Sequence, residues 1–168
     1  MKINALYIHG FMGTPNGGTY TALKNYFKDW NLISVPFEDL HTDVAKTQDK
    51  ISVLCKENDI NLLVGASLGA FYVLQQKGDF YKLVINPCME PSKIIPTLKD
   101  RKTNIPYSID EKVIDAWKKM EEYSDIPDMN PEKYFGIFSY DDELFHYRKK
   151  FNGLFGNDIN TVMVDGKH

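Results

Sequence analysis

The pentapeptide Gly65-Ala66-Ser67-Leu68-Gly69 directly follows an apolar run at residues 60–64. In this G-x-S-x-G pattern a serine sits on a sharp turn between a strand and a helix, and the strained backbone lifts its hydroxyl clear of the sheet. The two glycines leave room for the helix to lie close against the strand. The pattern predicts that Ser67 is a nucleophile for acyl transfer, whereas a turn of small residues is the alternative.

The residues around the pentapeptide favour the nucleophile. The run at 60–64 is typical of a buried strand, and residues 70–77 are compatible with a helix that ends before Gly78. A strand before the serine and a helix after it are the structural context that this motif requires.

A serine hydroxyl needs a base to remove its proton and a third group to orient that base. In serine hydrolases built on this turn, the chain order is serine, then acid, then histidine. The histidines that precede Ser67 are His9 and His41, which leaves His146 and His168. His146 falls in a predicted helix at residues 143–151, whereas His168 follows an apolar run through a turn. We therefore predict that His168 is the base.

The acid is expected in the loop after the predicted strand that ends at Ser139, where Asp141 and Asp142 stand side by side. We favour Asp142, because Leu144 and Phe145 can then tuck into the fold while the carboxylate stays at the tip of the loop. Asp141 remains the alternative, and the carboxylate that is not used would be an ordinary turn residue.

Acyl transfer also requires donors for the oxyanion that develops in the transition state. The backbone N–H of Leu68, the residue after the nucleophile, is one expected donor. The second is expected from the loop after the first strand, which reads His9-Gly10-Phe11-Met12-Gly13. Its glycines allow the chain to turn back so that the N–H of Phe11 faces the serine.

The elements that must position these groups follow a strand–helix alternation. Helical spacing of apolar residues is present at residues 19–30 and 42–56. Alternating strands and helices predict an α/β fold with a parallel sheet and right-handed crossovers, in a single domain over residues 1–168. The six apolar segments suited to buried strands are Ile3 to Ile8, Leu32 to Val35, Ile60 to Val64, Lys82 to Ile85, Phe135 to Ser139 and Asn160 to Val164.

Residues 88–132 form an unusually long connection that holds five of the eight prolines. Within it, Ser108 and Glu111 have the spacing of a capping box, followed by an apolar helical stripe. The connection is either a decorated crossover packed on the sheet or a lid over the carboxyl ends of the strands, where open α/β sheets bind ligands. The residues expected to contact substrate are Met12, Tyr107, Trp117 and Met120.

Composition limits the kinds of partner. The net charge of -3, with acidic and basic residues interspersed, provides no basic field for nucleic acid. No apolar run is long enough to span a membrane, and the start of the chain does not resemble a signal peptide. Cys55 and Cys88 are too few for a disulfide framework, and no Cys or His cluster has metal-ligand spacing. We expect a cytoplasmic protein that acts on small molecules.

Several separate motifs along the chain occur together and in a fixed order. They are Tyr7-Ile8-His9-Gly10-Phe11 with Thr14-Pro15, Leu23 to Phe27, Val64 to Ala70, Ile85-Asn86-Pro87, Asp142-Glu143 with Tyr147-Arg148, and Val164 to His168. In this combination the chain resembles the small bacterial esterases of the YqiA/YcfP type, within the α/β-hydrolase superfamily. The resemblance implies a mostly parallel sheet of about six strands, with helices on both faces and a small lid. It implies Ser67 as nucleophile, Asp142 as acid and His168 as base, with hydrolysis of carboxylic esters or acyl thioesters and no cofactor.

The chain departs from the family pattern in two places. Members of the family continue past the catalytic histidine into a terminal helix, whereas this sequence stops at His168, and relatives tend to have glycine where Asp141 stands. A terminal α-carboxylate beside the imidazole would favour its protonated form and oppose its work as a base. A weak enzyme that regains activity when residues are added after His168, or a binding protein that does not turn over its ligand, is the alternative expectation.

Overall fold

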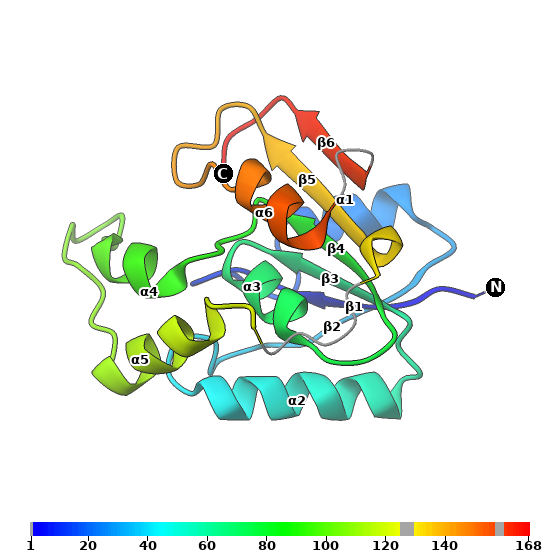
Figure 1. Ribbon diagram of the computed structural model, residues 1–168, viewed down its shortest axis with the longest axis horizontal. Coiled ribbons are helices and arrows are strands. Elements are labelled where there is room, and N and C mark those ends of the chain that lie inside the picture. The colour runs from blue at the N-terminus through cyan, green and yellow to red at the C-terminus, as the bar shows by residue number, and fades with distance from the viewer. Residues whose placement is uncertain (1, 125–129, 157–159) are drawn as a thin grey trace.

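Six parallel strands form one sheet in the order β2-β1-β3-β4-β5-β6, in a computed structural model that describes residues 2–124, 130–156 and 160–168 (Figure 1). The six predicted strands are confirmed, with ends that differ by at most two residues. The strands are β1 (Asn4–Ile8), β2 (Asn31–Ser34), β3 (Leu62–Ala66), β4 (Tyr81–Ile85), β5 (Tyr134–Ser139) and β6 (Thr161–Val164).

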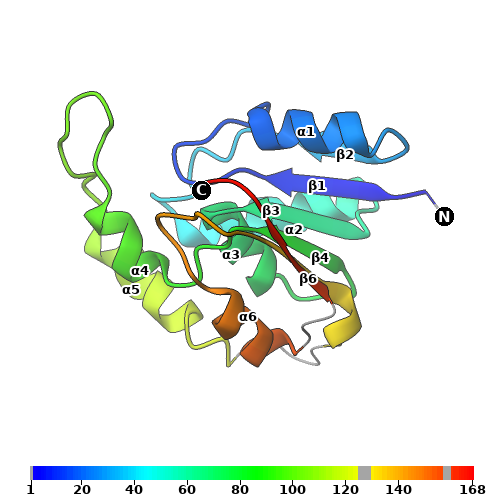
Figure 2. The ribbon, with the colours of Figure 1, turned by 90° about the horizontal axis from the view of Figure 1, so that it is seen from above.

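Helices cover both faces of the sheet (Figure 2). Helix α1 packs on one face through a small apolar cluster, and α2, α3, α5 and α6 contribute to the larger core on the other face. The helices are α1 (Gly18–Tyr26), α2 (Val44–Glu57), α3 (Leu68–Gln75), α4 (Pro91–Ile94), α5 (Glu111–Met120) and α6 (Arg148–Phe155), with 3₁₀ turns η1 (Ile95–Thr97) and η2 (Pro131–Lys133).

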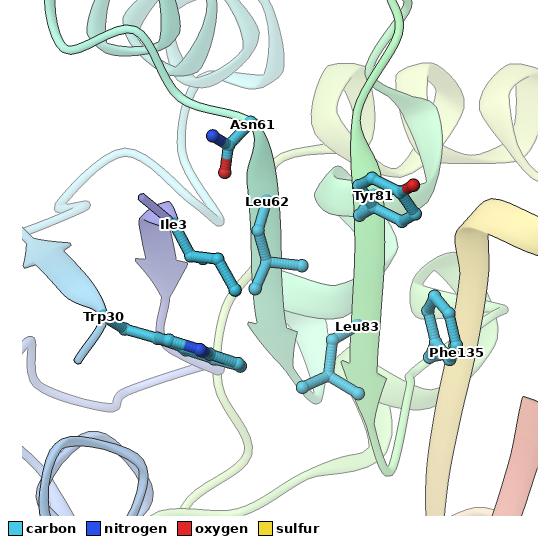
Figure 3. Close-up of a pocket in the computed structure, with 7 residues that line it drawn as sticks. All are labelled: Ile3, Trp30, Asn61, Leu62, Tyr81, Leu83 and Phe135. Atoms are coloured by element: carbon cyan, nitrogen blue, oxygen red, sulfur yellow. The ribbon is translucent and has the colours of Figure 1, made fainter. Parts of the chain in front are cut away.

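The sheet face on which α1 packs is less completely covered toward β6, at one edge of the sheet. On β6, Val162 and Val164 remain 52% and 39% exposed. At the amino ends of the strands the same face holds an apolar cavity of about 370 Å³, and Figure 3 shows its side chains on neighbouring strands. The residues that line it are Ile3, Trp30, Asn61, Leu62, Tyr81, Leu83 and Phe135.

The connection between β4 and β5 carries α4, η1 and α5, with a bridge between Lys99 and Pro106. Both ribbon views show α4 and α5 beyond the carboxyl ends of the strands (Figures 1 and 2). The predicted capping box is wrong, because Asp110 caps α5 by accepting the N–H of Lys112 at 2.8 Å. Residues 125–129 of the predicted 88–132 connection lie outside the described residues.

Lys82 on β4 is a buried cation beneath the larger core. Its side chain is 2% exposed, and its Nζ donates to the carbonyl of Gln76 at 2.6 Å, to that of Leu74 at 3.3 Å and to the hydroxyl of Tyr134 at 3.3 Å. The two carbonyls belong to the last turn and the C-cap of α3, where cations interact favourably with the helix dipole. Burial nevertheless lowers the pKa of Lys82 to about 8.

This buried lysine predicts a stability that rises with pH. Between pH 8 and 10.5 the folded chain has released the Lys82 proton while the unfolded chain still holds it, so the free energy of unfolding increases with pH. We expect wild type to gain about 1.4 kcal/mol per pH unit in this window relative to Lys82→Met. Urea denaturation at pH 7 to 10.5 measures the difference, and a difference that is independent of pH would contradict the prediction.

Candidate active site

Ser67 stands at the turn between β3 and α3 with a left-handed backbone, φ 52° and ψ −120°. A non-glycine residue in this region is strained, and such strain is typical of functional sites. A Cβ added at Gly10 would lie 2.9 Å from the Cβ of Ser67 and 3.5 Å from its Oγ. The glycine therefore keeps the neighbouring loop clear of the serine hydroxyl.

Ser67, His168 and Asp142 come together from three separate loops. The Nε2 of His168 lies 2.9 Å from the Oγ of Ser67, and its Nδ1 lies 2.9 Å from the Oδ2 of Asp142. Because the carboxylate accepts from Nδ1–H, the lone pair of Nε2 faces the serine hydroxyl. This tautomer is the one that can remove the proton of Ser67.

The carboxylate of Asp142 is buried and fixed by its own loop. Its side chain is 3% exposed, and its Oδ1 accepts the N–H groups of Leu144 at 2.8 Å and Phe145 at 2.9 Å. Asp141 is exposed, and its backbone N–H donates to the carbonyl of Gly166 in the histidine loop at 3.2 Å. The geometry thus brings Asp142 rather than Asp141 to the imidazole.

The structure also corrects the helix that was expected over residues 143–151. Helix α6 begins only at Arg148, and in the segment before it Asp142 accepts the N–H groups of Leu144 and Phe145. His146 lies in this irregular segment and is exposed.

Two further contacts hold His168. Its backbone N–H donates to the carboxylate of Glu143 at 3.1 Å, and the ring of Phe145 meets its imidazole edge-on, with centroids 4.4 Å apart. The N–H of Glu143 itself and the N–H of His168 lower the pKa of the Glu143 carboxyl by bonding its charged form. The acid loop therefore holds both the side chain and the backbone of the histidine.

His9 anchors the loop that follows β1. Its Nδ1–H donates to the carbonyl of Gly10 at 2.9 Å, while its Nε2 accepts the N–H of Phe37 at 3.1 Å. Burial lowers the pKa of His9, which favours this neutral form. His9 thus fixes the loop and is not itself directed at the serine hydroxyl.

The expected oxyanion donors lie in the two segments that flank Ser67. Leu68 is the first residue of α3, where a backbone N–H has no partner within the helix, and Phe11 follows Gly10 in the β1 loop. Within residues 2–124, 130–156 and 160–168, neither N–H donates to a protein acceptor. Their role as oxyanion donors stays a prediction.

The model of the uncharacterised protein family UPF0227 matches residues 4–168. The chain belongs to this family. The match spans the serine turn, the acid loop and the histidine, and it confirms the family assignment made from the sequence.

Solved structures that resemble this UPF0227 member are α/β hydrolases. Alpha/beta hydrolase domain-containing protein 10 from mouse has a TM-score of 0.64 at 15% identity, with 98% of this chain and 81% of that chain covered. The esterase domain of a Rhodothermus marinus protein has a TM-score of 0.64 at 16% identity, with 99% and 78% covered. Est1E from Butyrivibrio proteoclasticus, solved with ferulic acid bound, has a TM-score of 0.59 at 15% identity, with 98% and 79% covered. At these identities the likeness establishes the α/β-hydrolase fold.

One cavity opens at the serine of this UPF0227 member, and a second cavity adjoins it. Ser67 and His168 line one of about 250 Å³, whose walls include Tyr7, Ala66 and Ile85. The second, of about 300 Å³, shares His9, Gly13 and Thr14 with the first and extends toward Pro36, Phe37 and His41. The larger cavity of Figure 3 lies at the opposite ends of the strands and holds no residue of this site.

The four expected substrate contacts separate into two pairs. Met12 lines the second cavity, and the ring of Tyr107 packs edge-on against Phe11 with centroids 4.8 Å apart. Trp117 is fully buried instead, with its Nε1–H donating to the Tyr72 hydroxyl at 3.0 Å. Met120 lines a different cavity. Trp117 and Met120 therefore lie away from the serine, because their helix packs its apolar stripe into the core.

No group of three or more His, Cys, Asp or Glu side chains in the described ranges has the arrangement of a metal site. None of the described helices combines the length and apolar character needed to cross a membrane.

Proposed function

We propose that this protein is a serine hydrolase that cleaves carboxylic esters or acyl thioesters of small, apolar acyl groups. The observation that carries the proposal is the line of contacts from Asp142 through His168 to Ser67, with both hydrogen-bond distances at 2.9 Å. Such an arrangement of acid, base and nucleophile is recognised by geometry rather than by sequence position.

In the first step, the Nε2 of His168 takes the proton of Ser67 as its Oγ bonds to the acyl carbon. The N–H groups of Phe11 and Leu68 stabilise the tetrahedral oxyanion, and Asp142 stabilises the imidazolium. The bond to the leaving alcohol or thiol then breaks, and that group takes the proton from His168. Water attacks the acyl-enzyme in the same way, which releases the acid and restores the serine.

The size of the cavities supports small substrates. Volumes of about 250 and 300 Å³ lie just below and at the lower end of the usual range for ligand pockets. The Tyr7, Ala66 and Ile85 side chains favour an uncharged acyl group. Tyr107 and Met12 are the remaining candidates for substrate contact. The connection between β4 and β5, which carries Tyr107, then serves as a partial lid. The free, buried thiols of Cys55 and Cys88 are compatible with a cytoplasmic location.

Covalent labelling tests the proposal directly. We expect a fluorophosphonate probe to label wild type on Ser67 and to leave Ser67→Ala unlabelled, because only an activated serine attacks the phosphorus. The same pair, screened against p-nitrophenyl esters and acyl thioesters, identifies the leaving group and the acyl length. A wild-type protein that stays unlabelled while a control esterase reacts would favour a binding protein without turnover.

A further inference from the structure

Asn86, in the turn after β4, lies between two parts of the candidate site: the turn that carries Ser67, and the loops that carry Asp142 and His168. This asparagine has φ +42°, is 8% exposed, and lines the cavity that contains Ser67 and His168. A left-handed backbone is readily adopted by glycine and tolerated by asparagine, whereas other side chains are strained there. The position therefore favours residues that tolerate this backbone, such as Gly and Asn, and Asn, unlike Gly, brings polar side-chain atoms.

On one side, the residues that flank Asn86 hold the backbone of the serine. The N–H of Ser67 donates to the carbonyl of Ile85 at 3.0 Å, and the N–H of Cys88 donates to the carbonyl of Ser67 at 3.0 Å. The strained serine turn is thus bonded at both of its peptide groups to the segment centred on Asn86.

On the other side, the amide of Asn86 bonds Ser139 twice. Its Oδ1 accepts the backbone N–H of Ser139 at 2.8 Å, and its Nδ2 donates to the Ser139 hydroxyl at 2.8 Å. The orientation of the amide is determined by the backbone N–H, which can only donate. Asn86 therefore extends the pairing of β4 and β5 by one step, through a side chain.

Ser139 begins the segment that holds the base. Its hydroxyl lies 3.5 Å from the carbonyl of Lys167, the residue before His168. The next residues, Tyr140 and Asp141, donate their N–H groups to Val164 at 2.9 Å and to Gly166 at 3.2 Å. The loop that leads to Asp142 is therefore hydrogen-bonded to the loop that leads to His168, beginning at Ser139, which Asn86 binds.

We infer that Asn86 is a positioning residue that sets the distance between Ser67 and His168. The inference rests on the proposed function. The amide fixes the acid and base loops as one unit against the serine turn, so that the imidazole stays within hydrogen-bond reach of Oγ. A displacement of about 1 Å between reacting groups costs on the order of 100-fold in rate.

A double-mutant cycle between Asn86→Gly and His168→Ala tests this role, with the burst of p-nitrophenol from p-nitrophenyl acetate as the readout of acylation. Glycine keeps the left-handed backbone and removes only the amide. We expect Asn86→Gly to slow acylation by about 10- to 100-fold in the wild-type background, with KM changed less than about twofold. In the His168→Ala background, the same substitution should change the residual rate less than about twofold, because no base remains to be positioned.

Asn104→Gly is the matched control, since Asn104 also has positive φ, at 57°, and is exposed away from the site. Its acylation rate should equal that of wild type. Equal slowing by Asn86→Gly in both backgrounds, or no slowing in wild type, would overturn the positioning role while leaving the hydrolase intact. Full activity of His168→Ala would instead overturn the proposed function, and the positioning role with it.

Discussion

Replacing Asp142 by asparagine is expected to lower kcat by about 10⁴-fold while the protein stays folded. The N–H groups of Leu144 and Phe145 can only donate, so the amide oxygen of the new side chain, which can accept, must face them. Its NH₂ group then points at the Nδ1 of His168. The imidazole is forced to carry its proton on Nε2, where it donates toward Ser67 and cannot act as a base.

Asp141→Asn is the matched control for this substitution, because it makes the same chemical change one residue earlier on an exposed side chain. We expect its kcat to stay within about twofold of wild type, since surface substitutions away from buried networks have small effects. Initial rates on a p-nitrophenyl ester measure both variants, and circular dichroism checks their folding. A large loss in Asp141→Asn with a small one in Asp142→Asn would reverse the choice of acid.

The strands and the candidate site residues could be predicted because short sequence patterns and the order of residues along the chain indicate them. Parallel strands buried on both faces appear as continuous apolar runs, as Leu62 to Ala66 does. The serine turn adds its own glycines, and the order of serine, acid and histidine restricts the remaining choices to a few residues. Ser67, Asp142 and His168 were reached in this way.

Roles that depend on a distant partner could not be predicted. Trp117 and Met120 lie on the same apolar stripe and were both expected to contact substrate. Trp117 is instead buried and donates to the Tyr72 hydroxyl, 45 residues away in sequence. Asn86 was noted as part of an Asn-Pro pair, but its two bonds are to Ser139, which is 53 residues away. The later start of α6, at Arg148 rather than Glu143, was also missed.

The close approach of α3 to β1 makes Gly69 the most constrained glycine of the serine turn. A Cβ at this position would lie 2.2 Å from the carbonyl oxygen of Ile8 and 2.4 Å from that of His9. Both obstacles are backbone atoms of the central sheet region, so neither can rotate away as a side chain could. To make room for this Cβ, either α3 or β1 would have to shift as a whole element.

We expect Gly69→Ala to reduce the free energy of unfolding by about 3 kcal/mol or more, since overpacking a rigid site is costly. Gly153→Ala is the control, because a Cβ at Gly153 in α6 meets nothing within 4 Å and alanine gains about 0.5–1 kcal/mol in a helix interior. Urea denaturation distinguishes the two. Any folded Gly69→Ala protein should also lose acylation rate, because the displaced carbonyls lead directly into Gly10 and Phe11. A Gly69→Ala variant as stable and active as Gly153→Ala would contradict this close packing of the nucleophile turn against the first strand.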